Sequence, residues 1–198
     1  MSGKTGRRPR SAEQFEQTRS KISAQALKLF QEEGYDAVSI RRLAGEVGCA
    51  PMTIYAHFDG KIEILKHLWA AVLGGVFKEI EANLKHIDAP AERLRTAAYQ
   101  FTDYWLEHPD HFRMVFISND ITRTDVGTFI QDDKTRAHFK YFYGLVEAAS
   151  PNGSDIKSKA DVLIVTMIGA ALCSNTIGDY PWTDSRRLID LTLNSILV

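Results

Sequence analysis

The chain has 198 residues, of which 44% are apolar and 25% are charged, and its formal net charge is −1. These values are typical of a globular protein and exclude a fibrous repeat or a wholly disordered chain. The longest apolar stretch, Val162 to Cys173, is too short to cross a membrane, and the basic N-terminus leads into polar residues rather than a secretion signal. We therefore expect no membrane association.

The charge is distributed unevenly along the chain. Residues 1–60 contain 9 Lys and Arg against 7 Asp and Glu, whereas residues 61–198 contain 15 against 18. A basic N-terminal region followed by an acidic remainder is typical of a chain whose N-terminal segment binds a polyanion. A solvated tail would have the same composition. The two cysteines, Cys49 and Cys173, make no disulfide framework, which favours a reducing, cytoplasmic location.

The N-terminal third predicts three helices. Residues 1–12 are rich in Gly, Ser, Lys and Arg, and we expect a flexible tail there. Apolar residues then recur with helical spacing from Phe15 to Phe30, and Gly34 is typical of the position just after a helix.

The second and third helices are short. Ser39 is a typical N-cap for the second helix, and Gly48 ends it after about two turns. Pro51 suits the first turn of the third helix, and Asp59-Gly60 breaks it.

The remainder of the chain also has helical periodicity. Predicted helices cover residues 61–85, 90–106, 109–117, 128–149, 156–178 and 184–197, with a loop at 118–127. No segment shows the alternation typical of a strand. We therefore predict an all-α fold of about nine helices.

Residues 39–58 have the pattern of a helix-turn-helix motif, since two short helices flank a tight turn that contains glycine. Four apolar residues of the first helix share one face: Ile40, Leu43, Ala44 and Val47. Ile54 and Phe58 face inward from the second helix. The residues predicted to point outward are Pro51, Met52, Thr53, Tyr55, Ala56 and His57.

This outward face suits double-stranded DNA. The small side chains of Thr53 and Ala56 allow a helix to approach base edges in the major groove. Hydrogen-bond donors and cations for the phosphate backbone come from the same region. The predicted DNA-binding residues are Ser39, Arg41, Arg42, Pro51, Met52, Thr53, Tyr55, His57 and Lys61.

Residues 18–69 resemble the TetR family of bacterial transcriptional regulators. The resemblance lies in ALKLFQEEGYDAVSI, in RRLAGEVGCAPMTIYAHF, and in the continuation from Lys61 to Leu65. It implies a three-helix DNA-binding head at residues 13–60 and a helical body for effector binding and dimerisation at 61–198.

The resemblance also implies a mechanism. The protein is expected to be a homodimer, joined through two C-terminal helices of each subunit, and a repressor that a small effector releases from a palindromic operator. Effector binding is expected to tilt the helix at residues 61–85. Ser39, Thr53, Tyr55, His57 and Lys61 match positions that contact DNA in the family, whereas Ala50, Met52 and Arg42 depart from the family's usual residues.

The predicted body contains many aromatic residues, which line either a pocket for a largely apolar or aromatic effector or a dry core. The candidate ligand-binding residues are Trp69, Phe101, Tyr104, Trp105, Phe112, Phe116, Phe139, Phe142, Tyr143 and Met167. Two stripes in the last two predicted helices suit a dimer interface or, alternatively, packing within the chain. The first consists of Leu163, Met167, Ala170, Ser174 and Ile177, and the second of Leu188, Leu191, Ile196 and Val198.

No pattern points to catalysis, a cofactor or a metal. The cluster from Glu107 to His111 contains metal-ligand types, but Pro109 interrupts it and favours a helix start. No glycine-rich phosphate loop or nucleophile motif occurs. The alternative function, a helical small-molecule-binding protein or enzyme that does not act on DNA, has no motif of its own.

Overall fold

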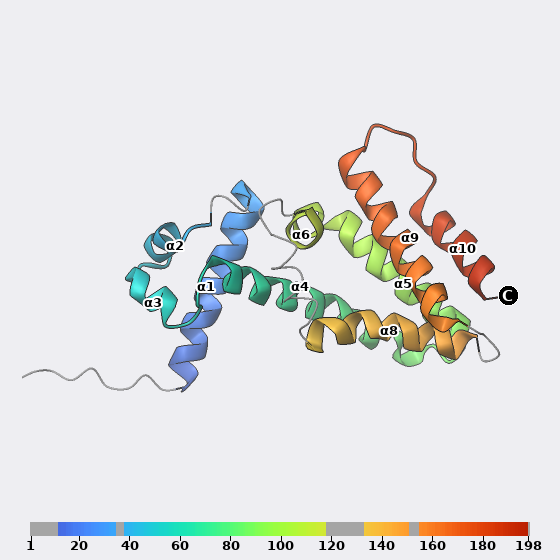
Figure 1. Cartoon of the computed structure of the whole chain (residues 1–198), viewed down its shortest axis with the longest axis horizontal. Coiled ribbons are helices and arrows are strands. Elements are labelled where there is room, and N and C mark those ends of the chain that lie inside the picture. The colour runs from blue at the N-terminus through green and yellow to red at the C-terminus, as the bar shows by residue number, and fades with distance from the viewer. Residues whose placement is uncertain (1–11, 35–37, 118–132, 151–154, 198) are drawn as a thin grey trace, which may run out of the picture. The chain divides into compact units, whose positions relative to one another are not determined.

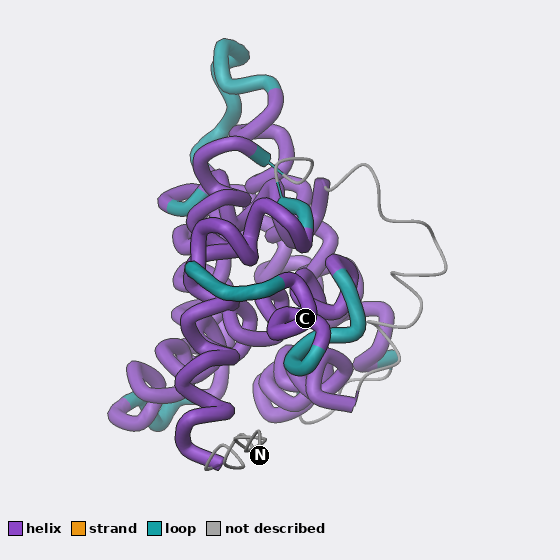
Figure 2. Tube along the Cα trace, turned by 90° about the vertical axis from the view of Figure 1, so that its left-hand side faces the viewer, coloured by secondary structure: helices purple, strands orange, loops and turns teal. Residues whose placement is uncertain are grey.

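The computed structural model describes residues 12–34, 38–117, 133–150 and 155–197. All regular structure in these ranges is helical, with nine α-helices and no strand (Figure 2). Three predicted features lie outside the described residues: the tail at 1–12, except for Ala12, the loop at 118–127, and the helix start at 128. Within the described ranges, the all-α prediction is confirmed.

The chain divides into two compact units, Met1–Leu68 and Trp69–Val198. The division falls inside helix α4, which spans Lys61–Asn83. Among the helices that the structure describes, none is long and apolar enough to cross a membrane.

The first unit contains α1 (Ala12–Glu33), α2 (Ile40–Val47), α3 (Pro51–Tyr55) and the start of α4. Helix α1 buries one side, which includes Ile22, Ala26 and Leu29. It ends where predicted, because Gly34 has a φ of +85° and donates its N–H to the Phe30 carbonyl at 2.9 Å.

Both ends of α2 are fixed by local hydrogen bonds. The Ser39 hydroxyl accepts a hydrogen bond from the Arg42 N–H at 3.2 Å, which satisfies one free donor of the first turn. At the other end, Gly48 has a φ of +73°, and Gly48 and Cys49 donate their N–H groups to the Gly45 and Ala44 carbonyls. The predicted caps of this helix are therefore confirmed.

The second unit contains the rest of α4 and a set of packed helices (Figure 1). They are η2 (Leu84–His86), α5 (Pro90–Glu107), α6 (Pro109–Phe112), the π-turn η3 (Arg113–Ile117), α8 (Asp133–Ala149), α9 (Ile156–Thr176) and α10 (Ser185–Ile196). Helix α5 packs against α8, α9 and α10, and α9 packs against both α8 and α10. Pro90 and Pro109 lie in the first turns of their helices, as predicted.

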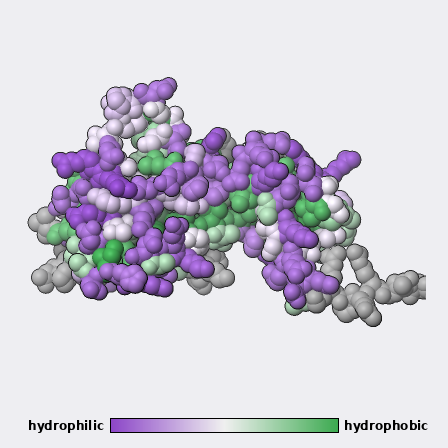
Figure 3. Space-filling model, turned by 180° about the vertical axis from the view of Figure 1, so that it is seen from behind, coloured by the Kyte–Doolittle hydropathy of each residue, from purple (hydrophilic) through white to green (hydrophobic). Residues whose placement is uncertain are grey.

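Large aromatic side chains fill the interior of the second unit. Trp105, Phe101 and Phe112 are almost completely buried, and the rings of Phe101 and Phe142 meet edge to face at 5.4 Å. The indole N–H of Trp69 donates to the Met114 carbonyl at 2.7 Å, so this buried polar group is satisfied. Most of the face shown in Figure 3 is hydrophilic, since the apolar stripes of the helices are turned inward.

Part of the two stripes predicted for a dimer interface is core instead. Leu163, Met167, Ala170 and Ile196 are buried within the chain, whereas Ile177 and Leu191 are exposed. The exposed apolar residues of the last two helices are Val162, Val165, Leu172 and Leu191. Helix α9 carries apolar residues around most of its circumference, so spacing alone does not decide which side faces the core.

Candidate nucleic-acid interface

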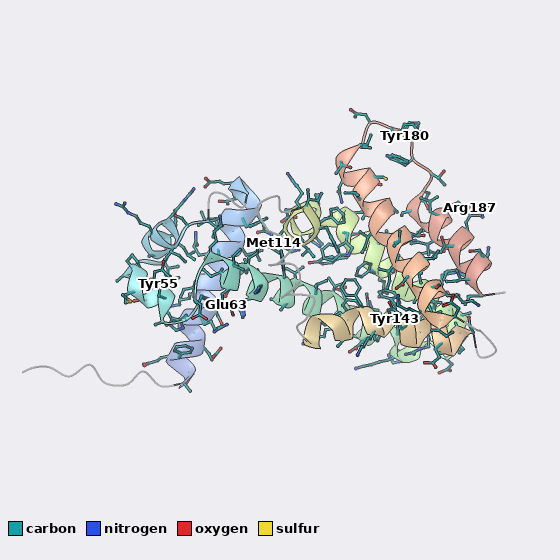
Figure 4. All side chains as sticks on the ribbon, viewed as in Figure 1. Tyr55, Glu63, Met114, Tyr143, Tyr180 and Arg187 are labelled. Atoms are coloured by element: carbon teal, nitrogen blue, oxygen red, sulfur yellow. The ribbon has the colours of Figure 1, made fainter. Side chains whose placement is uncertain are left out.

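Helix α3 presents one exposed side and one buried side. Met52 is 76% exposed and Tyr55 is 51% exposed, whereas Ile54 between them is fully buried. Pro51 and Ala56 are also exposed, and Thr53 is half-buried. Figure 4 shows Tyr55 on this helix. The predicted outward face is therefore present, with one exception.

The exception is His57, whose side chain is only 5% exposed. Its ring lies 4.1 Å from the ring of Phe15 in α1, measured between centroids. Helix α3 ends at Tyr55, so His57 follows a turn rather than the helical period of the exposed face. The prediction that His57 points outward is wrong, because the turn directs its ring toward α1.

Arg19 of helix α1 fixes the end of α3. In the sequence, this arginine is recognised only as part of the basic N-terminal region. The guanidinium of Arg19 donates to the main-chain oxygen of His57 and lies over the Phe58 ring, with 4.5 Å between its central carbon and the ring centroid. Arg19 lies at the spacing of the buried stripe that continues with Ile22 and Ala26. This spacing is the feature of the sequence from which the inward position of Arg19 could have been predicted.

The two arginines of α2 differ in their surroundings. Arg41 is exposed, whereas the guanidinium of Arg42 donates two hydrogen bonds to the carboxylate of Glu33. These bonds lower the pKa of Glu33 below its usual value, with the hydrogen bond from Arg42 as the main cause. Ser39, Arg41, Arg42, Gly45 and Glu46 line a shallow concave surface. To contact DNA, the Arg42 guanidinium must release the Glu33 carboxylate and bind a phosphate instead.

Lys61 is the first residue of α4 and is half-buried. It lines a small apolar crevice together with Phe30, Val38 and Leu65. The long aliphatic part of a lysine can lie along such a crevice while its ammonium group reaches water. Its position at a helix start is consistent with the predicted phosphate contact.

The ten candidate ligand-binding residues fall into two groups. Trp69, Phe101, Trp105, Phe112, Phe142 and Met167 are buried in the core of the second unit. The half-buried members are Tyr104, Phe116, Phe139 and Tyr143. The hydroxyl of Tyr143 donates to Asp161. Ligand binding by these residues remains a prediction, and Tyr104 alone among them lines the cavity described next.

A cavity of about 280 Å³ lies between α4 and α5 in the second unit. Its polar lining residues are Glu79, Gln100, Asp103, Tyr104, Glu107 and His108. The last five have the spacing of one helical stripe, a signal that the search for aromatic residues missed.

Tyr104 has the most perturbed environment in this cavity. Its hydroxyl and His111 Nδ1 lie 2.6 Å apart, and its ring lies 4.5 Å from that of His108. Burial, with the negative charges of Asp110 and Glu79, raises the pKa of Tyr104 to about 12. Among the described residues, no three His, Cys, Asp or Glu side chains are grouped so that they could hold a metal ion.

A family model described as bacterial regulatory proteins of the TetR family matches residues 22–68, which include α2, α3 and the start of α4. The transcriptional regulator HbdR of Aromatoleum sp. strain CIB is 29% identical over 123 residues, covering 62% of this chain and 54% of HbdR. Residues 22–68 thus match the DNA-binding domain of the TetR family.

The transcriptional repressor NicS of Pseudomonas putida is a second relative, 29% identical over 121 residues, or 59% of this chain and 53% of NicS. The chain thus spans about half the length of these two relatives.

Solved structures share the TetR-family fold along most of the chain. FadR of Bacillus subtilis, in a complex with stearoyl-CoA, has a TM-score of 0.73 at 16% identity and covers 90% of this chain and 97% of its own. FadR of Bacillus halodurans has a TM-score of 0.72 at 16% identity and covers 91% and 94%. At such low identity, the likeness concerns the fold alone.

Proposed function

We propose that this TetR-family chain is a ligand-responsive transcriptional repressor that binds a palindromic operator. The observation that carries the proposal is the exposed face of α3, where Met52 and Tyr55 point to solvent from a helix anchored by buried Ile54 and Phe58. A solvent-exposed methionine and tyrosine on an anchored short helix have no packing role in the chain. They suit the reading of a DNA groove.

The DNA contacts divide into two kinds. Thr53 and Met52 lie on the part of α3 that can approach base edges, so we assign them to sequence preference. Tyr55, Lys61, Ser39 and Arg41 supply donors or charge for the phosphate backbone and fix the orientation of the helix. His57 contributes through its carbonyl contact with Arg19 rather than through its ring.

The proposed active form is a homodimer. Val162, Val165 and Leu172 recur along one face of α9 and are all exposed, with Val165 at 69%, and Leu191 is exposed on neighbouring α10. Two apolar helices side by side form the kind of surface that a second copy covers. A dimer presents two copies of α3 to half-sites about 34 Å apart or a multiple of that distance.

The helical body is the proposed effector-binding part. FadR of Bacillus subtilis, which shares this fold, has been solved in a complex with stearoyl-CoA. We propose that the second unit of this chain likewise binds a small molecule and that α4 transmits the change to the DNA-binding unit. A full switch requires the effector to favour one state by about 5.5 kcal/mol.

Selection of binding sites from random duplex DNA tests this function. We expect the purified chain to enrich a near-palindrome and to bind it less tightly as salt rises, because phosphate contacts release counterions. An absence of any enriched sequence, with equally weak binding to all duplexes at low salt, would contradict the proposal.

A further inference from the structure

Met52 has the most exposed of the large apolar side chains that the structure describes. It lies in the first turn of α3, two residues before Ile54, which is fully buried. Because an α-helix turns by roughly 100° per residue, these two side chains lie on nearly opposite sides of the helix. The burial of Ile54 therefore holds the Met52 side chain in solvent, where a partner surface can cover it.

The segment around α3 has no side chain of the types that pair with purines or cytosine. The turn before α3, the helix itself and its C-cap together cover residues 48–56, GCAPMTIYA. This run contains no Arg, Lys, Asn, Gln, Asp or Glu. In the major groove, Arg and Lys pair with guanine, Asn and Gln with adenine, and Asp and Glu with cytosine. The hydroxyl of Thr53 remains, but a threonine hydroxyl is compatible with more than one base.

Thymine carries a group that an apolar side chain can recognise. Its C5-methyl group projects into the major groove, where the other base edges present hydrogen-bonding atoms. A methionine packed against this methyl group removes apolar surface from water. Packed against a guanine or adenine edge, the same side chain would cover polar atoms without pairing with them, which is unfavourable. The unbranched thioether of methionine is flexible and polarisable, so it can adapt to the position of the methyl group.

The backbone of α3 keeps Met52 in this exposed position. The N–H of Ala56 donates to the Met52 carbonyl at 3.1 Å, and the N–H of Phe58 donates to the Ile54 carbonyl at 2.9 Å. Ala56 follows Met52 by about one turn and is also exposed, so it adds a small apolar group to the same face. The side of α3 that faces solvent is therefore suited to methyl groups rather than to polar base edges.

We propose that Met52 contacts the C5-methyl group of a thymine in each half-site of the operator and thereby selects a T·A pair at that position. This inference rests on the proposed function, because it requires that α3 enters the major groove. It adds the chemical group by which the base is recognised. Arg41 and Lys61 contribute phosphate contacts, which carry no sequence information of their own.

Deoxyuridine provides the direct test, because it differs from thymidine only by the missing C5-methyl group. The operator selected with the wild-type chain is prepared with deoxyuridine at one thymine position of both half-sites at a time. Fluorescence anisotropy at fixed salt then gives the affinity. We expect one position at which binding weakens about fourfold for each methyl group removed, the value for transfer of one such group. Equal affinity with thymine and uracil at every position would overturn the proposal.

Variants of the chain locate the contact. In Met52→Ala, the thymine and uracil operators should bind within about twofold of each other, whereas Lys61→Ala should weaken both by the same factor. Thr53→Ser removes only a methyl group from the neighbouring side chain and should retain the difference. Because Met52 is exposed, Met52→Ala should keep the wild-type urea midpoint.

Two results with these variants would contradict the proposal. A uracil effect that persists in Met52→Ala would assign it to the shape or stiffness of the DNA. A uracil effect that disappears in Thr53→Ser would assign the methyl contact to Thr53.

5-Methylcytosine separates the methyl group from the rest of the T·A pair. Replacement of the contacted thymine by cytosine, paired with guanine, should weaken binding. 5-Methylcytosine at the same place should bind about fourfold more tightly than cytosine for each methyl group restored, in the wild-type chain but not in Met52→Ala. Equal binding of the two cytosine operators by the wild-type chain would overturn the proposal.

The same experiments separate this inference from the proposed function. If the chain selects an operator but binds its thymine and uracil forms alike, operator recognition stands and the methyl contact is refuted. If the chain selects no sequence, the proposed function is refuted and the inference fails with it.

Discussion

The guanidinium of Arg19 donates a hydrogen bond to the main-chain oxygen of His57, 3.0 Å away and 38 residues further along the chain. This bond joins α1 to the turn that ends α3. A charged donor to a carbonyl oxygen is stronger than a neutral hydrogen bond. It fixes the C-terminal end of α3, the helix that carries the proposed DNA-binding face.

We expect Arg19→Ala to lower the free energy of unfolding by about 1–2 kcal/mol, because it removes this bond and the contact with the Phe58 ring. Operator affinity should fall as well, since α3 loses its anchor. Urea denaturation and fluorescence anisotropy measure the two effects. Lys28→Ala is the control, because its ammonium only approaches Glu32 at the exposed surface, and it should cost less than about 0.5 kcal/mol. Equal stability of the two variants would refute the anchoring role.

Helix α3 lacks a side-chain cap. Ala50 occupies the N-cap position with extended backbone angles, φ −74° and ψ 147°, which serine adopts readily. We therefore expect Ala50→Ser to raise the free energy of unfolding by about 0.5–1 kcal/mol in urea denaturation. Ala148→Ser, at an exposed position inside α8, should give no gain. A loss of stability in Ala50→Ser would show that the hydroxyl does not reach the first-turn N–H groups.

The ends of α1 and α2 could be predicted because they depend on local chemistry. Gly34 and Gly48 adopt positive φ angles, and Ser39 accepts its capping bond three residues ahead. These interactions involve neighbours in sequence, so single residues indicate them. The π-turn at Arg113–Ile117 was not predicted, since nothing in its residues distinguishes it from an α-helical turn.

The sites were harder to predict because they depend on packing between distant segments. His57 continues the exposed pattern of Thr53 and Tyr55 in the sequence, but Phe15 of α1 covers its ring. Conversely, Glu79 of α4 and Gln100 of α5 line the same cavity, although they lie far apart in the sequence. Spacing predicts which residues share a face, but not what the face contacts.

Trp105 distinguishes a core role from ligand contact. Its side chain is fully buried, and its ring lies 5.7 Å from that of Phe101 and 5.1 Å from that of Phe116. We expect Trp105→Ala to cost about 3–5 kcal/mol in urea denaturation, the range for a large aromatic residue in a core. Trp182→Ala, at a 40% exposed position, should cost about 1 kcal/mol or less. A similarly small loss for Trp105→Ala would favour an effector-contact role instead.

Burial lowers the pKa of His111 below its ordinary value of 6.5, although Asp110 opposes the effect. The unfolded chain therefore takes up a proton before the folded chain does, and stability present above about pH 6.5 is lost as the pH falls through the lowered pKa. We expect the urea midpoint to fall between about pH 7 and pH 5.

His111→Asn should show a smaller fall in the urea midpoint, because asparagine keeps an acceptor for the Tyr104 hydroxyl without titrating. Some dependence should remain, since burial also lowers the pKa of His67. Identical pH profiles for wild type and His111→Asn would contradict this assignment.

The affinity of Tyr55→Ala for the selected operator tests the central claim most directly. The matched control is Tyr180→Ala, which removes a tyrosine of similar exposure, 57% against 51%, from the turn between α9 and α10 (Figure 4). Fluorescence anisotropy at fixed salt should show about five- to hundredfold weaker binding for Tyr55→Ala and no change for Tyr180→Ala. Wild-type affinity in Tyr55→Ala, with its fold intact, would show that the exposed face of α3 does not bind DNA.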